Sequence, residues 1–287
     1  MNEQKSLLIV GCGDIGNGLA EIYLARGWCV QGMRRNTDKL AAGITPLAAD
    51  VCSPQSLANL APLRADYVVI TLTPAGNGAE GYRAIFEEGL NNILAAMAEP
   101  PRLVLFVSST GVYAQANNEW IDEQSATEPS RFSGQSLLRA ERAVAATGWP
   151  YSNIRFGGIY GTGRLQMLNK VIDGDCAPPE PLHYSNRIHR DDCVGFLSHL
   201  IDLVEDQASI ASCYVGVDDE PASIQDVQAW LASELGVVYA GNGQPVTRAG
   251  SKRCSNKRLR DSGYQMKYPT FRQGFVPVLN EWRKLKA

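Results

Sequence analysis

Short apolar runs alternate with segments of helical periodicity through the first half of the chain. The apolar runs that predict strands are Leu7–Val10, Cys29–Met33, Thr45–Ala49, Tyr67–Thr71 and Leu103–Val107. The helical patterns between them cover Ile15–Arg26, Ser53–Leu60 and Gly81–Met97. Strands separated by helices predict an α/β fold of Rossmann type, with a doubly wound parallel sheet.

The second half of the chain is less regular. Its predicted elements are a helix over Gln135–Thr147, a strand near Tyr151–Arg155 and a helix over Ile224–Leu235 that Ser223 caps. Glycine and proline are frequent between residues 157–164 and 174–181. We therefore expect a nucleotide-binding domain of residues 1–156 plus about 187–217. A smaller C-terminal substrate or lid subdomain would take about 157–186 and 218–287.

Composition excludes several classes of protein. The chain has 287 residues and a net charge of −3, so no general attraction to nucleic acid or membranes is expected. Its seven cysteines include no C-x-x-C pair, which argues against a disulfide framework or a metal site. The first apolar run is shorter than the ~7–15 residues of a signal peptide core, and no stretch reaches the ~20 apolar residues of a membrane span. We expect a cytoplasmic protein that acts on a small molecule.

A glycine-rich loop follows the first predicted strand directly. Gly11, Gly13 and Gly16 form a G-x-G-x-x-G motif between that strand and a helical pattern. In a dinucleotide site the first glycine permits the turn, the second lets the backbone approach the pyrophosphate, and the third allows close packing of helix and strand. The helix N-terminus presents N–H groups to the phosphates. In this context the motif predicts dinucleotide binding.

Two arginines occupy the position that selects between NAD and NADP. Arg34 and Arg35 end the second predicted strand, about 20 residues beyond the glycine loop, where NAD-binding sites carry an acidic residue. Arginine at this position accommodates the 2′-phosphate, so NADP is the preferred cofactor and NAD the alternative. Asp50, after the third strand, is either a contact of the adenine or a turn residue.

Hydroxyl-bearing segments follow the fourth and fifth strands, where the ligand crevice of a doubly wound sheet lies. The expected cofactor-binding residues are therefore Gly11, Gly13, Asp14, Ile15, Gly16, Arg34, Arg35, Asp50, Thr71, Leu72, Thr73 and Ser108.

Several segments together resemble one family. Ser-Ser-Thr-Gly-Val-Tyr at 108–113 is similar to the S-S-x-x-V-Y-G signature of extended short-chain dehydrogenases/reductases, the epimerase/dehydratase group. The similarity continues through residues 121–123, 155–161, 187–192 and 255–259, in the family's order. The resemblance implies a Ser/Thr, a Tyr and a Lys that transfer protons while hydride passes to a nicotinamide. By register, Ser109 takes the Ser/Thr position.

The chain departs from this family at the catalytic dyad. The Y-x-x-x-K motif falls on Ser133 and Leu137, and the family's first glycine falls on Val10. Both departures resemble the atypical branch of the family, which keeps the fold and often the cofactor. Tyr264, with Lys267 three residues on, is the nearest approach to the motif elsewhere, and it lies in the wrong region.

Other groups could replace the missing dyad or bind the substrate. Candidate acids or bases are Tyr113, Tyr160, His183 and His189, and candidate substrate contacts are Thr110, His183, Arg164, Arg187 and Arg190. In the family the segment around His189 is mainly structural, which favours a core histidine whose hydrogen bonds are satisfied. For each arginine, surface charge is the simpler interpretation.

Three hypotheses remain open. The first is an NAD(P)-dependent oxidoreductase or epimerase-like enzyme that acts on a nucleotide-sugar-like or carbonyl compound with a non-standard acid/base set. The second is an NAD(P)-binding sensor without turnover. The third, a dehydrogenase of another class with a helical second domain, conflicts with the motifs of the second half. Relatives often dimerise through the helix that corresponds to Gln135–Thr147, so we also expect a homodimer.

Overall fold

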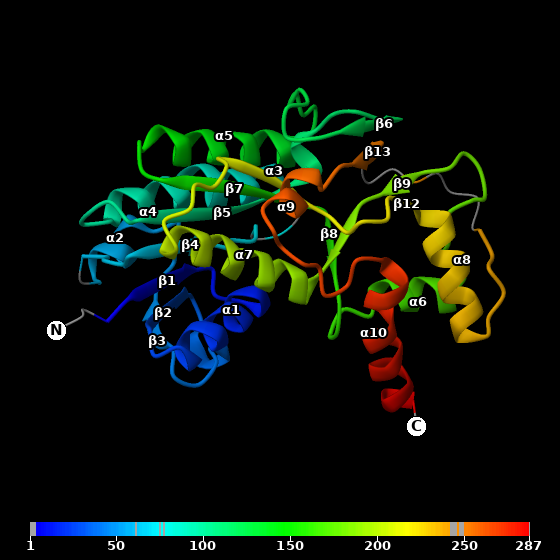
Figure 1. Ribbon diagram of the computed structural model, residues 1–287, viewed down its shortest axis with the longest axis horizontal. Helices are drawn as coiled ribbons and strands as arrows, with labels where there is room; N and C mark the ends of the chain where they lie inside the picture. The colour runs from blue at the N-terminus through cyan, green and yellow to red at the C-terminus, as the bar shows by residue number, and fades with distance from the viewer. Residues whose placement is uncertain are drawn as a thin grey trace. The chain divides into compact units, whose positions relative to one another are not determined.

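The computed structural model describes residues 4–60, 62–74, 76, 78–241, 246 and 250–286, drawn in Figure 1. The chain forms two compact units. Unit 1 comprises Met1–Val112, Thr127–Arg155 and Val194–Tyr214, and unit 2 comprises Tyr113–Ala126, Phe156–Cys193 and Val215–Ala287.

A seven-stranded sheet forms the centre of the α/β fold, as the sequence predicts. The strand order is β11-β7-β5-β4-β1-β2-β3. The strands are β1 (Ser6–Val10), β2 (Cys29–Arg34), β3 (Thr45–Ala48), β4 (Tyr67–Ile70), β5 (Leu103–Ser109), β7 (Tyr151–Phe156) and β11 (Cys213–Gly216). The pairings β1–β2, β1–β4, β2–β3 and β4–β5 are parallel. The order reverses beside β1, so the loop after β1 lies at the switch point of the sheet, where ligands of such folds bind.

Helices cover both faces of this sheet (Figure 1). They are α1 (Asp14–Ala25), α2 (Pro54–Ala58), α3 (Ala79–Arg83), the π-helical turn η2 (Ala84–Gly89), α4 (Leu90–Ala96), α5 (Phe132–Ala146) and α7 (Arg190–Glu205). On one face α4 and α5 are in contact. On the other, the Tyr23 hydroxyl of α1 donates to the Ser198 carbonyl of α7 at 3.3 Å. Strands β1 and β4 are almost entirely buried between these layers.

Local sequence signals explain where several helices begin. The Ser53 side chain accepts a hydrogen bond from the backbone N–H of Ser56, and Pro54 is the first residue of α2. Ser223 and Asp226 form a complete capping box at the start of α8 (Ile224–Leu235). Both helix starts confirm the sequence analysis.

Unit 2 is built from short paired strands and four helices of its own. The strands are β6 (Asn117–Ile121), β8 (Gly158–Tyr160), β9 (Tyr184–Ser185), β10 (Arg187–His189), β12 (Ala222–Ser223) and β13 (Ser251–Cys254). The helices are α6 (Gln166–Ile172), α8, α9 (Lys257–Asp261) and α10 (Phe271–Lys286). Tyr160, Phe271 and Phe275 belong to its apolar core.

The composition of unit 2 differs from the expected subdomain. It includes residues 113–126 and 187–193, which the sequence analysis assigned to the nucleotide-binding domain. Strand pairing is the physical reason, because β6 pairs in parallel with β13, and β10 pairs with β8. No helix in the described part of the chain is both long and apolar enough to span a membrane.

Candidate cofactor site

The glycine loop joins β1 to α1, and close contacts explain two of its glycines. Gly11 has a φ of +79°, and a Cβ there would lie 3.0 Å from the backbone of Leu72. A Cβ at Gly16 would lie 2.9 Å from the Ile9 side chain and 3.1 Å from the Cys12 sulfur. The first glycine therefore permits the turn, and the third permits close packing of α1 on β1.

Gly13 is different because its surroundings are open. A Cβ at this position would meet only the Gly11 carbonyl oxygen, at 3.7 Å. Gly13 immediately precedes α1 as its N-cap, without a side-chain hydrogen bond to the first turn. The backbone here is accessible to a ligand, as the pyrophosphate of a dinucleotide requires.

A cleft of about 260 Å³ lies beside this loop within unit 1. Its lining is Gly11, Cys12, Gly13, Met33, Arg34, Arg35, Asn36, Ala49, Asp50, Val51, Leu72, Thr73 and Ile85. The volume is somewhat below the ~300–1,000 Å³ of a typical small-molecule site. Most of its residues come from the loop and the ends of β2 and β3, the region that holds the adenosine end of a dinucleotide in this fold. Leu72 and Thr73, beyond β4, and Ile85 of η2 complete the lining.

The two predicted arginines lie at the end of β2. One guanidinium N–H of Arg34 donates to the Cys12 carbonyl at 3.1 Å, which holds this side chain against the glycine loop. Arg35 is exposed at the cleft edge. Asp50 contributes the carboxylate of the lining, and its Oδ1 accepts a hydrogen bond from the Cys52 backbone N–H at 3.0 Å. Asp50 thus forms a turn and faces the cleft at once.

Five predicted cofactor residues do not line the cleft. The Thr71 hydroxyl donates to the Gly11 carbonyl at 2.9 Å. Asp14, Ile15 and Gly16 form the first turn of α1. Ser108 is buried at the end of β5, where its hydroxyl donates to Glu141 at 2.6 Å.

Sequence reasoning did not single out six lining residues, which are Cys12, Met33, Asn36, Ala49, Val51 and Ile85. Five of them are direct neighbours of predicted residues, so their positions in the motifs could have identified them. Ile85 comes from η2, far along the chain, and no local signal marks it. Burial raises the pKa of the Cys12 thiol to about 11, although Arg34 opposes this rise. Cys12 is therefore a neutral lining group.

The turn after β5 lies against the beginning of α5. A Cβ at Gly134 would collide with the Gly111 carbonyl oxygen. The Ser109 hydroxyl accepts a hydrogen bond from the Gly111 N–H at 3.1 Å. In the same helix Leu137 is 7% exposed, so a buried leucine occupies the position of the family's lysine.

The other candidate residues lie in environments of several kinds. Thr110 begins η3 (Thr110–Val112). Tyr113 is buried in unit 2. Arg164 and His183 are half-buried. Arg187 is buried, and its guanidinium donates to the Ser185 hydroxyl at 2.5 Å.

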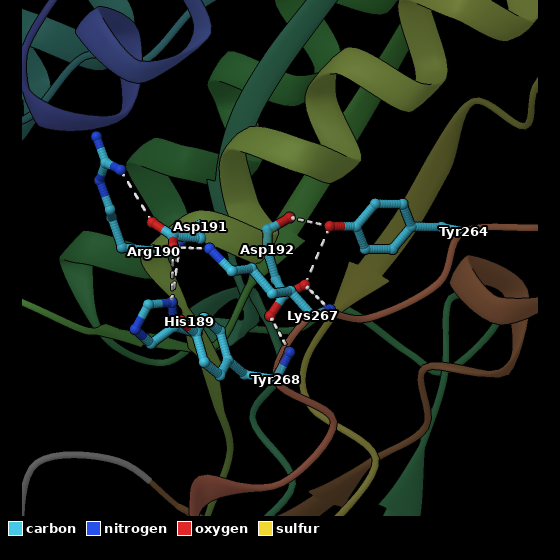
Figure 2. A network of polar contacts seen from close by, with 7 residues as sticks. All are labelled: His189, Arg190, Asp191, Asp192, Tyr264, Lys267 and Tyr268. Carbon is cyan, nitrogen blue, oxygen red and sulfur yellow. Dashed lines mark hydrogen bonds and ion pairs between the residues drawn. The ribbon is translucent and has the colours of Figure 1, made fainter. Parts of the chain in front are cut away.

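His189 belongs to a polar network in unit 2 that Figure 2 shows. Its Nδ1 accepts a hydrogen bond from the Asp191 N–H at 3.1 Å, and its ring packs against Tyr160 and Tyr268. Burial lowers the pKa of His189 to about 4. The side chain is 1% exposed, which confirms that the histidine lies in the core, but its Nε2 is buried without a hydrogen-bond partner among the described residues, so it is not the fully satisfied histidine that the sequence analysis favoured.

The same network accounts for the tyrosine and lysine near the C-terminus. The Tyr264 hydroxyl donates to Asp192 at 3.0 Å, and Lys267 pairs with Asp191 at 2.8 Å (Figure 2). The Asp192 carboxylate also accepts the backbone N–H groups of Lys267 and Tyr268. These contacts fasten the segment before α10 to the start of α7.

Comparison with known proteins identifies the family. No family model matches the chain. Protein YeeZ of Escherichia coli K12 is 31% identical over 209 residues, which cover 69% of this chain and 73% of YeeZ. A structure from Methylobacillus flagellatus, assigned as an NAD-dependent epimerase/dehydratase, is 37% identical with a TM-score of 0.85, covering 98% of this chain and 100% of its own. The chain belongs to the NAD-dependent epimerase/dehydratase family.

Solved structures of lower sequence identity share the fold. The UDP-glucose 4-epimerase of Thermus thermophilus, solved with NAD, has a TM-score of 0.79 at 17% identity, with coverage of 98% of this chain and 99% of its own. The Methylobacillus flagellatus structure, at 37% identity, confirms the family resemblance seen in the sequence motifs. In the described part of the chain, no group of three or more His, Cys, Asp or Glu residues could hold a metal ion.

Proposed function

We propose that this epimerase/dehydratase family member binds NADP in the unit 1 cleft, in preference to NAD, and acts as an oxidoreductase or epimerase-like enzyme on a small molecule. Arg34 and Arg35 at the end of β2 carry the cofactor proposal. They stand where an NAD-specific site has a carboxylate. The guanidinium groups offer charge-assisted hydrogen bonds to a 2′-phosphate.

The glycine loop supports the same proposal. The backbone at Gly13 would receive the pyrophosphate, because the space beside its Cα is open. Asp50 and Val51, with Ile85 from η2, would enclose the adenine, since all three line the cleft. When bound, the nicotinamide ring supplies or accepts a hydride.

The residues available for proton transfer differ from those of typical relatives. Ser109 retains the hydroxyl that would orient a substrate oxygen, and its contact with Gly111 fixes its direction. Ser133 and Leu137 supply neither a phenolate nor an ammonium group. Either the reaction of the substrate does not need the usual tyrosine base, or another group of the protein acts as the base.

The missing dyad also favours a second candidate function. A protein that binds NAD(P) without turnover would need the glycine loop and Arg34 but no acid/base pair. Buried Leu137 fits this sensor or regulator as well as it fits altered catalysis.

The cofactor proposal is tested by calorimetric titration of the full chain with NADP and with NAD. We expect tighter binding of NADP. The double variant Arg34→Ala/Arg35→Ala should lose about tenfold to a hundredfold in NADP affinity, the worth of a charge-assisted hydrogen bond, while NAD affinity changes little. Equal affinities that this double variant leaves unchanged would defeat the proposal.

Turnover separates the two candidate functions. The protein is incubated with NADPH or NADP and a panel of carbonyl and nucleotide-sugar compounds, and the absorbance of the reduced nicotinamide is followed. Oxidation or reduction that Ser109→Ala abolishes supports the enzyme and the role of Ser109. Silence in this absorbance, together with no epimerised sugar detected by NMR and measurable cofactor affinity, supports the sensor.

We also propose that the protein is cytoplasmic and forms a homodimer. All seven cysteines are free thiols, as suits a reducing compartment. The dimer would form through α5, whose outer surface includes Leu138 and Ala145, both only half-buried.

A further inference from the structure

The Asn17 side chain joins helix α1 to the loop that follows the two arginines of β2. Its Nδ2–H donates to the Lys39 carbonyl at 2.9 Å, and its Oδ1 accepts the Ala41 N–H at 3.1 Å. Lys39 is the last residue of the short 3-10 helix η1 (Thr37–Lys39). Because an amide carries a donor and an acceptor at a fixed separation, the two bonds fix this loop relative to α1.

Cys12 connects this contact to the first cleft arginine. The Cys12 thiol donates to the Asn17 Oδ1 at 3.6 Å, and the Cys12 carbonyl accepts the guanidinium N–H of Arg34 at 3.1 Å. Asn17 lies near the start of α1, where its own N–H donates to the Gly13 carbonyl at 2.8 Å. The glycine loop, Arg34 and the loop after β2 are therefore joined through Cys12 and Asn17.

Apolar packing holds the same loop against the sheet. Leu40 and Ile44 cover Gly32 of β2, where a Cβ would lie 2.9 Å from the Leu40 side chain and 2.7 Å from that of Ile44. Apolar contact is non-directional. The hydrogen bonds of Asn17, on either side of Leu40, therefore set the position of the loop along the sheet.

We propose that Asn17 is a positioning residue through which the cleft selects NADP over NAD. The inference rests on the proposed function, in which Arg34 and Arg35 bind the 2′-phosphate. A loop that Asn17 fixes presents both guanidinium groups before the cofactor arrives, so the cost of ordering them does not oppose binding. NAD lacks the 2′-phosphate and gains little from ordered arginines.

The test compares Asn17→Ala with the unsubstituted full chain by calorimetric titration of NADP and of NAD. Alanine is the best helix former, so α1 should remain intact. We expect a loss of about fivefold to fiftyfold in NADP affinity, the cost of ordering two arginine side chains on binding, and a change of less than about twofold for NAD. A purely structural role would weaken the binding of both cofactors equally, and that result would overturn the proposal.

The cleft arginines supply a second comparison. If Asn17 acts through them, Asn17→Ala should leave the NADP affinity unchanged in the Arg34→Ala/Arg35→Ala background, because the effects of coupled residues are not additive. An equal loss in both backgrounds would contradict the proposal. The matched control is Asn91→Ala, which removes an exposed asparagine whose Nδ2–H donates to the Glu87 carbonyl at 2.7 Å and should alter neither affinity.

Hydrogen exchange covers the case in which Asn17→Ala fails to fold. In the unsubstituted protein the Ala41 amide donates to Asn17, so its exchange should be slow, and NADP should slow it more than NAD does. Rapid exchange, or equal slowing by the two cofactors, would overturn the proposal. Equal affinities of the unsubstituted protein for NADP and NAD would defeat the proposed cofactor preference itself, whereas a preference that Asn17→Ala retains would defeat only the role of Asn17.

Discussion

At the residue scale, Gly13 and Gly16 belong to one motif but have opposite surroundings. The Gly16 position is closed by Ile9 and Cys12, whereas the Gly13 position is open. We predict that Gly16→Ala destabilises the protein by about 1–3 kcal/mol, the cost of overpacking. Gly13→Ala should change the free energy of unfolding by less than about 1 kcal/mol, because its methyl group meets no side chain.

Cofactor affinity should be more sensitive to Gly13→Ala than to Gly16→Ala, the reverse of the order expected for stability. The methyl group of Gly13→Ala would occupy the space that the pyrophosphate needs, so we expect a loss of NADP affinity of about tenfold or more. Urea unfolding gives the stability and calorimetry gives the affinity. A stable Gly13→Ala protein with full NADP affinity would show that the phosphates do not approach this loop.

Residues of the candidate site were predictable where a local motif carries their geometry. The arginines at the end of β2 could be predicted, because β2 pairs with β1. The end of β2 therefore lies beside the glycine loop, at a fixed spacing from it along the sequence. Ile85 could not be predicted, because it reaches the cleft from η2, far along the chain from the glycine loop.

At the scale of elements, Glu141 joins α5 to two strands. Its carboxylate accepts hydrogen bonds from Arg155 of β7, at 3.0 and 2.6 Å, and from Ser108 of β5. The Glu141 and Arg155 side chains are 4% and 9% exposed. We predict that Glu141→Gln lowers the free energy of unfolding by about 3–5 kcal/mol, because it leaves a buried guanidinium without its counter-charge.

An exposed ion pair serves as the control for this prediction. Lys257 and Asp261 pair within α9 with side chains 76% and 59% exposed. The change Asp261→Asn should cost about 0–1 kcal/mol. Denaturant titration measures both variants. Equal losses in the free energy of unfolding would mean that burial does not make the Glu141–Arg155 pair more important for stability than an exposed pair.

Element prediction succeeded where burial imposes a pattern. The strands β1, β4 and β5 are apolar because helices cover both faces of the sheet. The helical pattern over Gly81–Met97 is real, but the structure divides it into α3, η2 and α4. Strands β6 (Asn117–Ile121) and β13 (Ser251–Cys254) lack apolar alternation and pair with each other although they are distant in sequence. The sequence therefore did not predict them.

At the scale of the whole molecule, the proposed homodimer makes a definite prediction. Phe132, at the start of α5, is 42% exposed and contacts Tyr82 of α3. Together with the half-buried Leu138, it gives the outer surface of α5 more apolar area than a solvated helix needs. We predict a dimer in analytical ultracentrifugation, and a monomer for Phe132→Glu/Leu138→Glu because the charges would be buried in the interface.

The control substitutes an exposed apolar residue elsewhere. Val276→Glu on α10, at a position 50% exposed, should leave the dimer intact. A monomeric unsubstituted protein, or a dimer that survives the α5 substitutions, would contradict the predicted interface.

The sequence alone determined the α/β fold, the glycine loop, the arginines and the absence of the family's tyrosine and lysine. These features depend on periodicity and on spacing within a few dozen residues, which one chain displays directly. Only the tertiary structure decided that Ser108 bonds to Glu141, that Ile85 lines the cleft, and that β6 pairs with β13. Each of those facts depends on contacts between distant segments, and local sequence carries no record of which segments will meet.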